Sequence, residues 1–91
     1  MKDSKNWRIV AKKFEDTTER ITDIREWVPE NIVVVVDYAY KENPIIKLYN
    51  EGEDKPFAQG KVGDYVVNDN GRYDILPKES EKITEILLSA K

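Results

Sequence analysis

Residues 31–50 decide the fold, and they read NIVVVVDYAYKENPIIKLYN. Four consecutive valines follow Ile32, and β-branched side chains, which are stiff at χ1, favour a strand. This run is apolar on both faces, which predicts a central strand over Asn31–Tyr40. Residues 41–44 form a turn, and Ile45–Asn50 then returns as the neighbouring strand.

Before this hairpin, the sequence predicts a strand and then a helix. Trp7–Phe14 alternates, although imperfectly, between the two faces of a strand. Asp16 and Glu19 have the spacing of a capping box, with Asp16 as the N-cap. Pro29 ends the helix, because the residue before a proline avoids the α region, and the helix is expected over Thr17–Val28. Its apolar side is formed by Ile21, Ile24 and Val28.

After the first hairpin, Val62–Ile75 is expected to form a second one, and its turn can have either of two lengths. A two-residue turn pairs Val67 with Asp74. A three-residue loop, with Gly71 as a left-handed bulge, pairs Val67 with Tyr73. Only the second choice places Asp74 on the solvent face, so the pattern predicts the bulged loop.

The last helix is expected to begin with Pro77 at its first position. The element order is β-α-β-β-β-β-α, with residues 57–59 as a further short strand or an extended link. Short connections favour antiparallel pairing, although the first strand and the valine strand, which are joined through a helix, are candidates for parallel neighbours. We therefore expect one α+β domain over residues 1–91, a mainly antiparallel twisted sheet with both helices on one face.

The composition excludes several kinds of chemistry. The chain has no cysteine and no histidine, which removes thiolate catalysis, the usual general base and the commonest metal ligand. Asp64, Asp69 and Asp74 are the most tempting carboxylates for a catalytic set, and we interpret them as structural because Asp favours turns and exposed positions. We expect no catalytic residue, no metal, no cofactor and no enzyme activity.

Charge and hydropathy restrict the partners. A net charge of −3 does not suit nucleic-acid binding, which neutralises phosphates. The basic stretch in residues 1–13 fits an edge strand protected by lysines. The longest apolar run, Ile32–Val36, is far shorter than the ~20 residues of a membrane helix, and the first residues lack the apolar segment of a secretory signal. We expect neither a nucleic-acid nor a membrane partner, and a cytoplasmic location.

Aromatic side chains are the remaining signal for a binding surface. We interpret Trp27, Tyr65 and Tyr73 as core residues. Strands gain about 3.3 Å per residue and helices only about 1.5 Å, so the 31–50 hairpin is expected to extend beyond both helices. The uncovered end holds Tyr38, Tyr40 and Tyr49, which we predict to be the binding residues, with plain packing as the alternative.

The stretch Gly63-Asp64-Tyr65-Val66-Val67, followed by Asn70-Gly71-Arg72-Tyr73, resembles the C-terminal hairpin of a family of small tailed-phage and prophage proteins. The strand at Ile9–Phe14 and the helix at Thr18–Val28 resemble the start of the same family, so the similarity covers nearly the whole chain. The last helix departs from the pattern, because it lacks the usual Phe and Tyr and its proline comes one residue early. The resemblance implies a phage protein acting in the host cytosol, without an established activity or ligand.

These observations predict a non-catalytic binding module that contacts a protein. The partner is a host factor that it inhibits or modulates, or a second copy of the chain. The alternative is a small-ligand or nucleotide binder, with tyrosine rings stacking on a base and Arg8, Lys12 or Lys13 near phosphate. A third option is a minor virion or assembly component.

Overall fold

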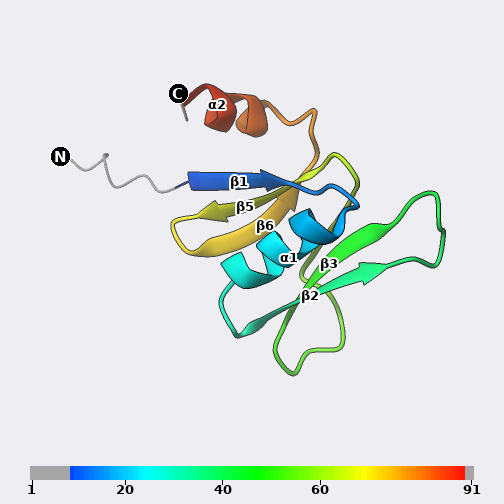
Figure 1. Ribbon diagram of the computed structural model, residues 1–91. Helices are drawn as coiled ribbons and strands as arrows, with labels where there is room; N and C mark the ends of the chain where they lie inside the picture. Colours follow the sequence, from blue (N-terminus) through cyan, green and yellow to red (C-terminus); the bar gives the residue numbers. More distant parts are fainter. Residues whose placement is uncertain (1–8, 90–91) are drawn as a thin grey trace.

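The computed structural model of the chain describes residues 9–89 (Figure 1). Its elements are, in order, β1 (Ile9–Lys13), α1 (Thr18–Trp27), β2 (Ile32–Asp37), β3 (Ile45–Asn50), β4 (Ala58–Lys61), β5 (Tyr65–Asp69), β6 (Arg72–Leu76) and α2 (Glu81–Ser89). The α+β class is confirmed, and the short strand near residues 57–59 is present as β4. The predicted first strand includes Trp7 and Arg8, which lie outside the described residues.

The strands form two antiparallel sheets, whereas the sequence predicted one. Sheet A has the order β1-β5-β6, and sheet B has the order β2-β3-β4. The predicted parallel neighbours β1 and β2 are therefore in different sheets, because β1 pairs with β5 across a long sequence separation. The predicted central strand β2 is an edge strand, and β3 lies at the centre of sheet B.

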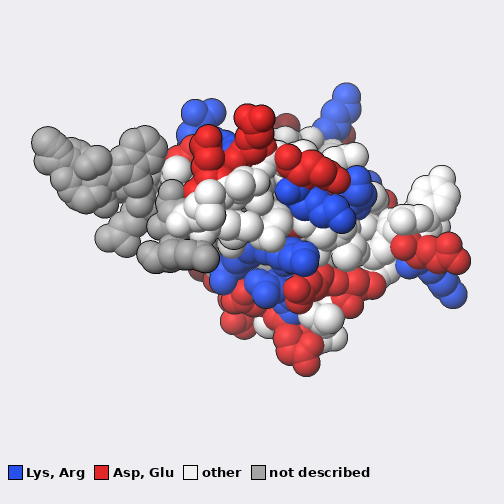
Figure 2. Space-filling model, turned by 90° about the horizontal axis from the view of Figure 1, so that it is seen from above, with Lys and Arg blue, Asp and Glu red and all other residues white. Residues whose placement is uncertain are grey.

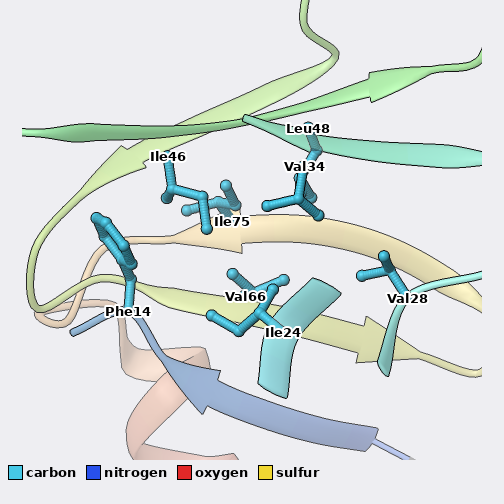
Figure 3. Close-up of a cluster of buried hydrophobic side chains, with 8 residues drawn as sticks. All are labelled: Phe14, Ile24, Val28, Val34, Ile46, Leu48, Val66 and Ile75. Atoms are coloured by element: carbon cyan, nitrogen blue, oxygen red, sulfur yellow. The ribbon is translucent and has the colours of Figure 1, made fainter. Parts of the chain in front are cut away.

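The main core lies between the two sheets and α1. Sheet B directs Val34, Ile46 and Leu48 toward Val66 and Ile75 of sheet A (Figure 3). Ile24 and Val28, from α1 and its C-cap, fill the same layer together with Phe14. A hydrophobic core lies between packed layers of secondary structure, and sheet B is the layer opposite sheet A.

The other face of sheet A is covered by α2, so the expectation of both helices on one face is wrong. Val67 of β5 packs there against Ile83 and Ile86 of α2. The cause lies in β5, where the neighbouring residues Val66 and Val67 point to opposite faces and are 0% and 2% exposed. A strand with buried side chains on both faces needs another element packed against each face.

The turn between β5 and β6 has two residues, so the predicted bulged loop is wrong. Val67 pairs with Asp74, while Asn70 and Gly71 have φ angles of 56° and 98°, as a type I′ turn requires. Gly71 is left-handed as expected. The prediction assumed that a residue sharing a face with a buried residue must itself be buried. Asp74 shares a face with buried Val67, and it is nevertheless exposed because β6 is an edge strand.

The predicted bounds of α1 are confirmed to within one residue at each end, but its N-cap is Thr17 and not Asp16. The Thr17 hydroxyl oxygen accepts a hydrogen bond from the Arg20 amide at 3.1 Å. The Asp16 carboxylate is used elsewhere, because it accepts the hydroxyl of Tyr38. Both residues are good N-caps, so the sequence alone does not separate them.

The helix α2 begins at Glu81, four residues later than predicted. Pro77 starts a turn instead, in which its carbonyl accepts the Ser80 amide at 3.0 Å. The Ser80 hydroxyl then accepts the Lys82 amide at 3.2 Å, a capping interaction at the start of the helix. Ile83 and Ile86 are buried on α2 as expected.

Candidate functional site: the outer face of sheet B

Sheet B has a second face, directed away from the core. Because successive side chains of a strand alternate, every second residue of β2, β3 and β4 lies on this face. We call this surface the outer face, and it consists of Val33, Val35, Asp37, Ile45, Lys47, Tyr49, Gln59 and Lys61. All of these side chains are exposed or half-buried.

The valines of β2 make the outer face partly apolar. Val33 is 45% exposed and Val35 is 36% exposed, and they stand opposite Tyr49 and Lys47 of β3. The run is apolar on both faces as the sequence shows, but only one of these faces is buried, so it does not mark a central strand. The signal that the sequence offered was Lys47, because a lysine in the middle of the paired strand marks that face as open to water.

An ion pair lies near the end of the outer face. The Lys47 Nζ and an Asp37 carboxylate oxygen are 2.9 Å apart, and the other Asp37 oxygen accepts the Ala39 amide at 2.9 Å. The hydrogen bond from Lys47, and then that from Ala39, lower the pKa of Asp37, and the bond to Asp37 raises the pKa of Lys47. The contribution of this pair to stability is present above pH 3.8 and is lost as the pH falls through the lowered pKa.

A shallow hollow of about 200 Å³ lies where the outer face meets the loop between β2 and β3. Its lining consists of Asp37, Ala39, Tyr40, Asn43, Ile45, Lys47 and Gln59. Tyr40 is 74% exposed, so most of its ring is in water. The Asp37 side chain shapes this loop, because its bond to the Ala39 amide turns the chain out of the strand.

The structure does not gather the three predicted binding tyrosines into one surface. Tyr49 lies on the outer face opposite Val33, and Tyr40 lines the adjoining hollow. Tyr38 instead donates its hydroxyl to the Asp16 carboxylate at 2.8 Å, ahead of α1. The prediction that the strand continues to Tyr40 is wrong, since β2 ends at Asp37. The predicted core aromatics do pack against the interior, with Trp27 and Tyr73 in edge-to-face contact at 5.4 Å.

The bond between Tyr38 and Asp16 leads to a pH prediction. Donation of the phenol proton to the carboxylate raises the pKa of Tyr38 above 10.0. We expect Tyr38 to ionise at a higher pH in the parent chain than in the Asp16→Ala variant, as followed by NMR of the tyrosine ring carbons. The variant removes the hydrogen bond that is the largest cause of the raised pKa of Tyr38. Coincident Tyr38 titrations in the parent chain and the variant contradict the contact.

The carboxylates that the sequence suggested for catalysis each have a structural partner. Asp64 is 6% exposed and accepts the amides of Lys61 at 2.9 Å and Lys78 at 3.4 Å. Asp69 faces Lys82 at 3.3 Å, and Asp74 accepts the amide of the residue after it. Within residues 9–89, no three side chains of the metal-binding types are placed to hold an ion.

The basic residues considered for phosphate do not form a described site. Lys12 pairs with Asp23 at 3.0 Å and lies over the Trp27 ring at 5.3 Å. Arg8 lies outside the described residues. On the face seen in Figure 2, acidic and basic side chains are intermingled. That face therefore has no large area of one charge, such as nucleic-acid binding proteins use.

Comparison of the chain with family models, with curated proteins and with solved structures finds no match. In the described part of the chain, neither helix has the length and apolar character needed to cross a membrane. The fold and the outer face define a small α+β domain with two packed antiparallel sheets and one sheet face left open.

Proposed function

We propose that this chain is a non-catalytic binding module that contacts a protein partner through the outer face of sheet B. The observation that carries the proposal is the exposure of Val33 and Val35 in the middle of a regular sheet face. Antiparallel sheets usually present polar side chains to water, and apolar side chains gathered on an open face favour contact with another protein.

The side chains around these valines suit a protein contact. Tyr49 and Tyr40 offer large aromatic surfaces with a polar hydroxyl, which are enriched at the centres of protein interfaces. Asp37 and Lys47 are already paired with each other at 2.9 Å, so neither needs a charged partner when water is excluded. The outer face thus combines an apolar centre with a neutralised charged border.

The small-ligand alternative has weaker support. The hollow beside Tyr40 has a volume of about 200 Å³, below the roughly 300–1,000 Å³ of usual ligand sites. Its one basic lining residue, Lys47, is bonded to Asp37. A nucleotide requires free cations near its phosphates, and the described lining of the hollow does not offer them.

The resemblance to tailed-phage proteins suggests a host factor in the bacterial cytosol as the partner. The residues that carry this resemblance have structural roles in this fold. Gly63 has a φ of 100° in the turn before β5, Asp64 is buried beside it, and Gly71 forms the hairpin turn. The motif therefore supports a shared fold more directly than a shared partner, and the proposed contact rests on the outer face.

The contact surface can be tested by comparing variants as bait. Tagged parent chain, the Val33→Ser/Val35→Ser variant and a Leu88→Ser control are each incubated with bacterial lysate, and retained proteins are quantified by mass spectrometry. Leu88 is 65% exposed on α2, which covers the opposite side of sheet A. We expect the double variant to lose at least about tenfold of the partner that parent and control retain.

Folding of each bait is checked by circular dichroism before the comparison. Equal retention of every captured protein by the parent and the double variant contradicts the proposal. The same conclusion follows if the Leu88→Ser control loses the partner as strongly as the double variant, because the contact then lies elsewhere.

A further inference from the structure

The strand β2 is an edge strand whose own residues lack the usual protection against pairing with another chain. Natural proteins protect edges with lysines, prolines or a covering element. β1 carries Lys12 and Lys13; β6 carries Arg72, and it also has β4 as a neighbouring element. β2 has the sequence IVVVVD, without a proline or a basic residue. Among the edges in residues 9–89, β2 is thus the one most suited to accept a strand.

The hydrogen-bonding pattern of the ladder gives the direction of the β2 backbone groups. The Glu51 amide donates to the Asn31 carbonyl at 2.8 Å, which continues the pairing of β2 with β3. Residues directly opposite each other alternate between bonded and non-bonded pairs in an antiparallel ladder. Val33 and Val35 therefore bond toward β3, and Ile32, Val34 and Val36 direct their amide and carbonyl groups toward the open edge.

One side chain reaches this edge from within the described part of the chain. The Arg25 Nε, on α1, lies 3.4 Å from the Val34 carbonyl oxygen. This contact supports the assigned direction of the Val34 carbonyl. It is long for a hydrogen bond and comes from an exposed side chain, so a strand that offers a backbone amide can replace it.

We propose that two copies of this chain pair along β2, antiparallel about a two-fold axis, with Val34 opposite Val34 of the second copy. Sheet B then becomes a continuous sheet of six strands, three from each copy. This arrangement goes beyond the proposed partner contact, because it adds the backbone groups of the edge, which that contact does not use. It is an isologous contact, in which the same residues serve both copies.

The register of this pairing is self-complementary. With Val34 on the axis, Val33 of each copy stands opposite Val35 of the other, and both are exposed in the single chain. Asp37 stands opposite Asn31, so no two like charges face each other across the new edge. Pairs of β-branched side chains directly opposite each other stabilise antiparallel strands.

The pairing also enlarges the outer face. Three strands of up to six residues make a face of about 20 Å by 14 Å. This footprint is well below the roughly 800 Å² per partner of a standard protein interface. Two outer faces joined along β2 double the area and bring four exposed valines together in its middle, which the single chain does not offer.

Disulfide trapping tests both the pairing and its register. The chain has no cysteine, so Val33→Cys and Val35→Cys introduce single thiols. In the proposed register these two positions form a non-hydrogen-bonded pair with Cα atoms about 4.5 Å apart, which a disulfide can bridge. Identical positions are offset diagonally by about 7–8 Å, which is too far. One variant is labelled with ¹⁵N so that mixed dimers are identified by mass.

We expect a mixture of the two variants to form the mixed disulfide several-fold faster than either variant forms its own. Leu88→Cys, mixed with each of them, gives the rate of random collision. Sedimentation equilibrium of the parent chain should show a dimer fraction that rises with concentration.

A mixed disulfide that forms no faster than the Leu88→Cys control overturns the pairing. If the same-site disulfides form as fast as the mixed one, the register is wrong. A parent chain that stays monomeric at every concentration also overturns this inference, and it leaves the partner contact of the bait experiment in place.

Discussion

Replacing Gly60 with valine is expected to lower the free energy of unfolding by about 3 kcal/mol, at the upper end of the usual range for overpacking a closed interior. Gly60 lies on β4 and faces the core, where sheet B comes close to sheet A. A Cβ atom at this position would stand 2.5 Å from a methyl carbon of Ile75 and 3.0 Å from a carboxylate oxygen of Asp64. Such distances require the buried Ile75 side chain to shift, together with the sheet that carries it or the sheet opposite.

The comparison with Gln59→Val separates this clash from other effects of valine. Gln59 is the exposed neighbour of Gly60 on the same strand and faces the other side. Valine favours strands, so without a clash both variants should be neutral or slightly more stable. The two midpoints in urea are measured side by side. A Gly60→Val midpoint equal to that of Gln59→Val contradicts the close approach of the two sheets at this point.

The role of Gly60 illustrates what the sequence did not reveal about the fold. Short segments with clear local signals were predicted well, such as α1 from its caps and apolar spacing and β3 at its observed bounds. The division into two sheets was missed because it depends on β1 pairing with β5, more than fifty residues later in the chain. Gly60 permits the sheets to meet, but a lone glycine in a sequence gives no sign of what approaches it.

The valine run shows why the candidate surface was only partly predicted. Periodicity describes which residues share a face, but it does not state which faces another element covers. Apolar residues on both sides of β2 suggested a central strand, whereas Val33 and Val35 turn out to be exposed. The tyrosines were selected from a strand extending to Tyr40. The bond between Asp37 and the Ala39 amide ends that strand three residues earlier.

The same limitation explains the hairpin register. Keeping Asp74 away from the interior was a sound rule for a sheet with one open face. In the structure, α2 covers the face that carries Val67, while Asp74 on the edge strand β6 shares that face and is still exposed. The dipeptide Asn70-Gly71 favoured the two-residue turn on local grounds, and this local preference was the better guide.

Replacing Asp64 with alanine is expected to lower the free energy of unfolding by about 2 kcal/mol, because charged groups contribute roughly 1.5–3 kcal/mol through buried hydrogen bonds. The Asp64 carboxylate joins the turn after β4 to the loop before α2 through the amides of Lys61 and Lys78. Its backbone carbonyl also accepts the Phe14 amide at 2.8 Å, at the end of β1. Three segments distant in sequence thus meet at one residue.

Two further variants show whether the carboxylate acts through these bonds. Asp64→Asn keeps the shape and one acceptor oxygen, so we expect about half of the loss seen with alanine. Asp54→Ala removes a carboxylate from an exposed loop and should leave the urea midpoint unchanged. Amide hydrogen exchange provides a local measurement, since the Lys61 amide should exchange faster in Asp64→Ala. Unchanged stability together with unchanged exchange at Lys61 means that the Asp64 carboxylate does not stabilise the turn. A buried carboxylate without a structural role is then a candidate for a chemical role.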